Sequence, residues 1–427
     1  MLIQFSFKNF RSFRDDNILD LSATRITEHN NHIIKTGNEN SLLPIAAVFG
    51  ANASGKSNLL EAFKYMTTYV ISSFAYGGED DEKRSTIEFI KPTPFILDKS
   101  SKDAESSFEV YFIDSEYDGG TTYNYGFTIN QTGVVEEWLN YRTKSRTKFK
   151  KMFYRNNDEL DLSGISSKSQ ENIKISLEKE TLIVSLGTKL KISKLKHIRD
   201  WFINNEIADF GLPIEDYILS DRLPHGFVES EEIRQNVVKY FASFDSSIIG
   251  FYVKPTDSND SNRKKRFRVD SIHKMINSDE TVTIPLKLES AGTLKMFALY
   301  PLLQDVLAAG GVLFVDELNS KLHPLLVRAF IITFLNPEIN KNNAQLIFTT
   351  HDSWQLDNNL LRRDEIWFVE KSDEGISTIY SLADFFDDNG EKIRKDESYE
   401  KNYLLGKYGA IPNMKDFDMF KEVKSDV

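Results

Sequence analysis

Residues 50–57 read Gly-Ala-Asn-Ala-Ser-Gly-Lys-Ser. Their pattern, G-x-x-x-x-G-K-S, is typical of loops whose backbone N–H groups turn toward a phosphate. Lys56 would reach the terminal phosphates, and Ser57 could ligate Mg²⁺. An apolar run at 43–49 predicts a buried strand before the loop, and apolar residues at helical spacing over 58–70 predict a helix after it. That context favours a phosphate-binding loop over an ordinary surface turn.

Composition excludes several classes of protein. The 427-residue chain has 64 Asp and Glu against 53 Lys and Arg, so its net charge of −11 repels polyanions and any nucleic acid must be held by a local basic patch. The absence of cysteine excludes disulfides and thiolate metal sites. Lys8, Arg11 and Arg14 interrupt the start of the chain, unlike a signal peptide, and no apolar run approaches the ~20 residues of a membrane span. We therefore expect a folded, cytoplasmic protein of two lobes without a membrane partner.

An acidic pair supplies groups that a phosphate loop lacks for hydrolysis. The apolar run at 312–315 predicts a buried strand, and Asp316 and Glu317 follow it directly. Asp316 is expected beside Mg²⁺, and Glu317 beside the water that attacks in line. Paired acids after a strand can also reflect the charge preference of a helix start. The upstream phosphate loop favours the catalytic interpretation.

Two further segments are candidates for contact with the nucleotide. The run at 345–349 predicts a strand that leads to His351, at the interval expected for a γ-phosphate sensor, although a lone histidine at a strand end is often structural. Residues 290–293, Ser-Ala-Gly-Thr, precede a predicted helix at 293–307 and by themselves match a helix cap. Their position between the phosphate loop and the acidic pair indicates a role beyond that of a helix cap.

The segments between these motifs predict an α/β protein. Strand patterns over 95–139 indicate an antiparallel meander, and beyond 282 strands and helices alternate as in a largely parallel sheet. Helical spacing over 166–205 and 229–244 indicates a short helical insertion that interrupts a single nucleotide-binding sheet.

Two local basic tracts could hold a polyanion in spite of the acidic total. Residues 142–150 alternate strictly, and if they form a strand, one face of it is wholly basic. The second tract is a polar and basic loop at 259–268. A solvated surface is the alternative for each tract. The basic residues concerned are Arg142, Lys144, Arg146, Lys148, Lys150, Arg263, Lys264, Lys265, Arg266 and Arg268.

Together the motifs resemble the ATP-binding-cassette (ABC) ATPases of the chromosome-maintenance and recombination-repair branch, the SMC/RecF-like group. Residues 9–13, Asn-Phe-Arg-Ser-Phe, match the opening strand of that group, and 50–58 match its loop G-x-N-x-S-G-K-S-N. Residues 290–293 stand where the group keeps its signature motif. The acidic pair matches Walker B, and His351 matches the switch histidine.

The chain is similar in more detail to the abortive-infection, anti-phage ATPases of the RloA or AbiL type, which have a short helical insertion and an ending like residues 403–412. This resemblance implies an ABC-ATPase head, in which a mixed sheet with the phosphate loop and an antiparallel β subdomain are interrupted by that insertion. The implied parts are the first half of the head (1–150), the helical insertion or lid (151–245), the second half (246–390) and a tail (391–427).

The resemblance also implies ATP and Mg²⁺ as cofactors. Glu317 and His351 would be catalytic, with Ser57 and Asp316 as metal ligands. The implied nucleotide-binding residues are Arg11, Gly50, Asn52, Ala53, Ser54, Gly55, Lys56, Ser57, Asn58, Ser290, Gly292 and Thr293.

A head-to-tail dimer, or a higher oligomer, is the implied assembly. ATP would lie between Lys56 of one subunit and Ser290 and Gly292 of the other. Three departures from the family pattern bear on hydrolysis rate and metal sensing. No glutamine between Lys64 and Tyr125 can serve as a Q-loop, the signature reads S-A-G-T, and an asparagine at 319 replaces the usual aspartate.

Two functions follow as hypotheses. In the first, the chain is the sensor or regulator of a two-component anti-phage system that responds to a phage protein and controls a separate effector, expected to be a TOPRIM-like nuclease, since only residues 352–427 follow His351. In the second, it is a DNA-repair or chromosome-maintenance ATPase whose basic tracts clamp duplex DNA. A transporter subunit is a distant third.

Overall fold

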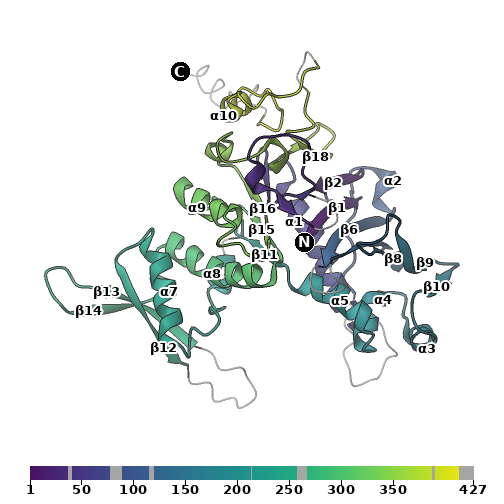
Figure 1. The fold of residues 1–427 in the computed structure, drawn as a ribbon, viewed down its shortest axis with the longest axis horizontal. Coiled ribbons are helices and arrows are strands. Elements are labelled where there is room, and N and C mark those ends of the chain that lie inside the picture. The colour runs from purple at the N-terminus through teal and green to yellow at the C-terminus, as the bar shows by residue number, and fades with distance from the viewer. Residues whose placement is uncertain are drawn as a thin grey trace, which may run out of the picture.

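The fold is described from a computed structural model of the chain, over residues 1–36, 41–76, 89–114, 120–212, 214–256, 267–386 and 390–412. Two large sheets lie on either side of helix α1 (Lys56–Ser72), and a small three-stranded sheet projects from the body of the molecule (Figure 1). Within these ranges, no helix combines the length and the apolar character that a membrane span requires.

The sheet that carries the motifs has six strands in the order β11-β15-β16-β5-β17-β18. Every neighbouring pair is parallel except β17 with β18. Buried apolar clusters cover both faces, which is why its central strands are uninterrupted apolar runs. The largely parallel sheet expected behind the phosphate loop is confirmed. Its strands are β5 (Ile45–Phe49), β11 (Glu206–Asp209), β15 (Val312–Asp316), β16 (Gln345–Thr350), β17 (Ile366–Lys371) and β18 (Ser377–Ser381).

The second sheet has seven strands, all paired antiparallel, in the order β10-β9-β8-β7-β6-β1-β2. The predicted meander forms its centre, and the amino-terminal strand joins it at β6. Its strands are β1 (Leu2–Lys8), β2 (Asn17–Asp20), β6 (Ser106–Asp114), β7 (Thr121–Asn130), β8 (Gly133–Arg142), β9 (Lys150–Arg155) and β10 (Leu160–Asp161).

The strand predicted at 142–150 is wrong. Strand β8 ends at Arg142 and β9 begins at Lys150, and because Tyr141 pairs antiparallel with Lys150, the chain must reverse between them. Residues 143–149 therefore form a loop. The guanidinium of Arg142, at the end of β8, lies 5.0 Å from the centre of the Phe149 ring in this loop. The basic side chains lie on an exposed hairpin loop and not on one face of a strand. Of the second basic tract, residues 259–266 lie outside the described residues, and Arg268 lies in strand β13 (Phe267–Lys274).

Helix α1 packs between the two sheets. The Phe63 ring lies 5.2 Å from that of Phe5 in β1 and 5.8 Å from that of Phe314 in β15. Gln345, the buried first residue of β16, joins the sheets by a second route, because its side chain accepts from the Leu2 N–H at 2.6 Å and donates to the Leu2 carbonyl at 2.9 Å. The helix that follows the phosphate loop is thus fixed from both sides.

Segment 151–245, expected as a helical insertion, contains the predicted helices but also β9, β10 and β11, which belong to the two large sheets. The apolar spacing identified the helices, whereas strands this short gave no pattern. The domain boundaries themselves stay a prediction. The helices of this segment are α3 (Ser167–Ser176), α4 (Ile183–Lys189), α5 (Ser193–Ile203), α6 (Glu215–Leu219) and α7 (Glu231–Ala242).

The remaining elements surround the six-stranded sheet and form the projecting arm. Strands β12 (Ile248–Pro255), β13 and β14 (Thr281–Pro285) form that arm beside α7 (Figure 1). Helices α8 (Ala291–Ala309) and α9 (Pro324–Leu335) cover the sheet face opposite α1. Short elements are β3 (Ile34–Lys35), β4 (Ser41–Leu42), α2 (Lys99–Lys102), α10 (Tyr399–Leu404) and 3₁₀ turns at Asn30–His32, Ser73–Ala75, Leu286–Leu288, Ser353–Gln355 and Arg363–Glu365.

The tail at 403–412 packs on the body of the molecule. Tyr403 stacks on Phe368 of β17 with ring centres 5.5 Å apart, and Tyr408 is fully buried. The aromatic residues of this tail therefore contribute to the core around β17.

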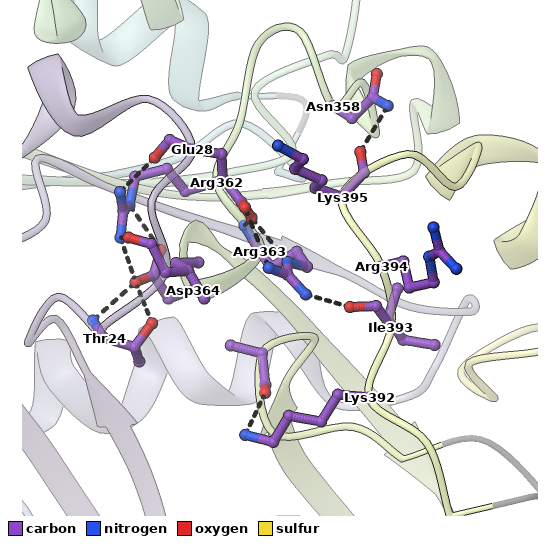
Figure 2. A network of polar contacts seen from close by, with 12 residues as sticks. Thr24, Glu28, Asn358, Arg362, Arg363, Asp364, Lys392, Ile393, Arg394 and Lys395 are labelled. Carbon is purple, nitrogen blue, oxygen red and sulfur yellow. Dashed lines mark hydrogen bonds and ion pairs between the residues drawn. The ribbon is translucent and has the colours of Figure 1, made fainter.

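A buried polar network joins three segments that are distant in sequence (Figure 2). Arg362 is fully buried, and its guanidinium pairs with Asp364 at 2.9 Å and donates to the Glu28 carbonyl. Asp364 also accepts from the Thr24 hydroxyl at 2.8 Å. Arg363 pairs with Glu28 at 2.7 Å and donates to a backbone carbonyl near the tail. These bonds fasten the N-terminal segment and the start of the tail to the turn before β17.

We predict that Arg362→Leu lowers the free energy of unfolding by about 3–5 kcal/mol, because it leaves the Asp364 carboxylate buried without its partner. Urea unfolding followed by tryptophan fluorescence would measure this. Arg394→Leu is the control, since Arg394 pairs with Asp396 at an exposed position of the same region, and it should leave the midpoint unchanged. Equal midpoints for both variants would contradict a stabilising role of the buried network.

Candidate functional site

The phosphate loop connects β5 to α1 and closely approaches other segments of the same chain. Gly55 has φ +117°, and a Cβ atom there would lie 2.5 Å from the Ser377 hydroxyl oxygen and 2.9 Å from that of Ser12. Ala53 also has a left-handed φ of +62°. A side chain at position 55 would therefore be strained and would collide, so the glycine is required by both the turn and the close approach.

Two serines from distant segments support the loop. The Ser377 hydroxyl donates to the Ser54 carbonyl at 2.5 Å, and its oxygen lies within hydrogen-bond distance of the Ser12 hydroxyl oxygen, at 2.8 Å. Asn58 donates to the Ser12 hydroxyl at 2.7 Å from the first turn of α1. Ser12 belongs to residues 9–13, which were expected as the opening strand but form a turn after β1, since β1 ends at Lys8 and Arg11 has φ +51°. Ser377 starts β18 and was not predicted, because nothing in its local sequence indicates a contact with the loop.

Lys56 is buried at the start of α1. Its ammonium donates to the carbonyls of Gly50 at 2.9 Å and Ala51 at 3.0 Å, and lies 3.4 Å from His351 Nδ1. Burial lowers the pKa of Lys56 to about 8, although the nearby Glu317 carboxylate opposes the shift. The loop carbonyls thus hold the ammonium among the N–H groups that would receive a phosphate, and a phosphate would favour its charged form.

Asp316 ends β15 and is oriented by the neighbouring strand. Its carboxylate accepts from the Thr349 hydroxyl of β16, and the same hydroxyl accepts from the Glu317 N–H at 2.9 Å. Asp209, which was not predicted, ends β11 and lies opposite Asp316 in the register of the two parallel strands. Burial and the negative charge of Asp316 raise the pKa of Asp209. Within the described ranges, no three His, Cys, Asp or Glu side chains gather as a metal site. A cation here would therefore need hydroxyl and phosphate oxygens besides Asp316.

Glu317 faces His351 across the site. Glu317 Oε1 lies 2.8 Å from His351 Nε2, and Glu317 itself has a left-handed φ of +52° that turns it out of the strand direction. Burial raises the pKa of Glu317, but the hydrogen bond and charge of His351, with the charge of Lys56, outweigh burial and hold it below the ordinary value. Glu317 is therefore an ionised carboxylate at neutral pH and can accept a proton.

Asn319 supports the histidine. Its side-chain oxygen accepts from the Thr350 hydroxyl at 2.8 Å and from the His351 N–H at 3.3 Å. The residue that departs from the family pattern thus fixes the strand end carrying His351.

The phosphate loop, Glu317 and His351 line one open cavity of about 430 Å³. Lys371, the last residue of β17, lies on its wall and was not predicted. Arg11 and Asp316 are not among the lining residues, although the Arg11 guanidinium contacts Asn58 at 3.4 Å, and Glu61 at 3.0 Å. The lining residues are Asn52, Ala53, Ser54, Gly55, Lys56, Ser57, Asn58, Glu317, His351 and Lys371.

The predicted signature residues lie elsewhere. Ser290 is the N-cap of α8, and its hydroxyl accepts from the Thr293 N–H at 3.1 Å, as its sequence context predicted. Gly292 lies against the loop after β15, where a Cβ would be 3.0 Å from the Lys321 carbonyl. None of Ser290, Gly292 and Thr293 is among the residues that line the cavity.

The cavity fits a nucleoside triphosphate with a divalent cation. Lys56 and the helix start supply positive potential, and the Ser54 hydroxyl is buried without a hydrogen-bond partner beside the loop. Ser57 and Asp316 supply the hydroxyl and carboxylate oxygens that Mg²⁺ prefers.

A family model matches the part of the chain that contains these residues. The family described as "AAA domain, putative AbiEii toxin, Type IV TA system" matches residues 45–353, which include the loop, the acidic pair and His351. Among solved structures, the SMC head domain from Thermotoga maritima is similar at 15% sequence identity with a TM-score of 0.39, over 89% of this chain and 98% of that one. At that identity and TM-score, the similarity says nothing about activity.

We predict that Gly55→Ala weakens ATP binding at least ~10-fold, because the new methyl group would collide with the Ser377 hydroxyl. Gly390→Ala is a matched control, since Gly390 has φ +76° and a Cβ atom added there would have no other atom within 4 Å. Calorimetric titration with ATP and Mg²⁺ would compare the two. Wild-type affinity in Gly55→Ala would show that this loop geometry does not hold the nucleotide.

Proposed function

We propose that this chain, which belongs to the AAA-domain family matched over residues 45–353, binds ATP and hydrolyses it to ADP and phosphate. The observation that carries the proposal is the convergence of Lys56, Glu317 and His351 on one cavity with the phosphate loop. A loop that only bound a phosphate would need neither the ionised Glu317 nor the histidine that orients it.

The chemistry follows from the positions of these groups. Lys56 and the loop N–H groups would bind the β- and γ-phosphates and stabilise negative charge as the terminal P–O bond breaks. Glu317 would accept the proton of the attacking water, and His351 would orient Glu317 and contact the γ-phosphate. Ser57 and Asp316 would hold Mg²⁺, which neutralises phosphate charge when it is bound.

A head-to-tail dimer accounts for the signature segment. Ser290 and Gly292 lie at the start of α8, outside the cavity that contains the phosphate loop of the same chain. In the proposed assembly, or in a higher oligomer built from it, they contact the γ-phosphate of ATP bound to a second subunit. ATP would then close the pair and hydrolysis would release it, so the output is a conformational change.

The narrower proposal concerns the biological role. The family description refers to a toxin of a toxin–antitoxin system, and the sequence resembles anti-phage ATPases of the RloA or AbiL type. We place this ATPase in an abortive-infection response in the cytoplasm, where a phage protein is the trigger. The conformational change would control a separate effector, a TOPRIM-like nuclease or another toxin.

We predict that Glu317→Gln binds ATP like wild type but turns it over about 10²–10⁴-fold more slowly, because the amide cannot accept the proton. Its ATP-bound dimer should accumulate, as measured by light scattering. Lys56→Ala should lose both ATP binding and dimer formation. Glu231→Gln on α7 removes an exposed carboxylate as a control. Full turnover by purified Glu317→Gln would overturn the assigned base.

A DNA clamp remains the second candidate, supported by the exposed basic loop between β8 and β9. If duplex DNA is held there, changing Lys144, Arg146 and Lys148 to Glu should reduce the affinity and lower the salt slope by about 2–3. Changing Lys191, Lys194 and Lys196 of the α4–α5 region to Glu is the control. The regulator hypothesis predicts that both triple variants bind duplex DNA as weakly as wild type does across a salt series.

A further inference from the structure

Lys295 is a buried charge for which the catalytic chemistry has no use. It lies in the first turns of α8, close after the Ser290 cap, and its side chain is 0% exposed. Burying an ammonium is unfavourable unless it is fully hydrogen-bonded. Its position therefore calls for a compensating set of contacts.

Those contacts are three backbone carbonyls of the segment that follows β15. The Lys295 ammonium donates to the carbonyls of Glu317 at 2.9 Å, Leu318 at 3.0 Å and Ser320 at 2.9 Å. An ammonium has three donors, so the set is complete. It also lies 4.3 Å from the centre of the Phe210 ring. One side chain thus fixes the loop that begins with Glu317 to the helix that begins at the signature segment.

We propose that Lys295 is a positioning residue that couples the signature end of α8 to Glu317. Nucleotide bound by one subunit would thereby affect the position of the catalytic base in the other subunit. This inference rests on the proposed dimer. Gly292 packs on the Lys321 carbonyl at the far end of the same loop, so contact of a second subunit's nucleotide with residues 290–293 would be transmitted through α8. Asn319 continues the connection from this loop to His351.

The charged groups around Lys295 come from three places. Asp216 of α6 forms an ion pair with Lys321, and both act on Lys295. Asp316 and Glu317 lie at the end of β15. The pKa of Lys295 is lowered to about 7, chiefly by burial and in part by the Lys321 charge, while the three carboxylates oppose the shift. The charged form prevails below this pH, so the coupling should weaken as pH rises through the region of 7. An arginine at this position would stay charged.

The test compares Lys295→Met and Lys295→Arg with wild type by steady-state ATPase kinetics, together with equilibrium ATP binding. Lys295→Met should bind ATP with unchanged affinity, lose kcat ~10- to 100-fold through misplacement of Glu317, and turn over ATP without cooperativity. Lys295→Arg should recover kcat and lose the decline above about pH 7. Asn340→Leu is the control, because Asn340 also caps buried carbonyls, at 3.0 Å and 2.8 Å, but at the opposite end of β16.

Wild-type kcat and cooperativity in a folded Lys295→Met would overturn the inference. If Lys295→Met does not fold, the pH profiles decide, since an identical decline in wild type and Lys295→Arg would equally overturn it. A wild-type protein that binds ATP without hydrolysing it would instead contradict the proposed function.

Discussion

The parallel pairing of β5, β16 and β15 is the constraint on which the site depends. Because parallel strands end at the same edge of a sheet, the phosphate loop after β5, the acidic pair after β15 and His351 after β16 are brought together although they are far apart in sequence. Helix α1, packed against both sheets through Phe63, fixes the direction in which the loop opens. Changing the register of β15 by one residue would turn Asp316 toward the opposite face of the sheet.

Local sequence was sufficient for the centre of the site. Residues 50–57 contain the glycines and the lysine that identify a phosphate loop. The apolar runs before Asp316 and His351 identify buried strands without reference to the rest of the chain. The same reasoning failed at 142–150, where alternation of basic residues resembled a strand although the antiparallel pairing of β8 with β9 requires a turn. Through the pairing of β17 with β18, Ser377 reaches the phosphate loop and Lys371 reaches the cavity, and no local pattern indicates a long-range contact of that kind.

One departure from the family pattern, Asn319, has a structural role in this chain. Asn319, in place of an aspartate, accepts hydrogen bonds from Thr350 and His351 and thereby holds the histidine toward Glu317. Behind it, the Lys295 ammonium fixes the backbone of the same loop. The Glu317 carboxylate is therefore supported from two directions, by the strand end that carries His351 and by the helix that starts at Ser290. Such support on rigid elements is what a site needs to keep a carboxylate in a productive orientation.

We propose that the ends of β5, β15 and β16 form one nucleotide site in each chain. Equilibrium dialysis of the protein with labelled ATP, in the presence and absence of Mg²⁺, measures whether that site exists. Saturable binding of one ATP per chain that strengthens with Mg²⁺ is the predicted result. Absence of saturable binding at millimolar ATP by folded protein would contradict it.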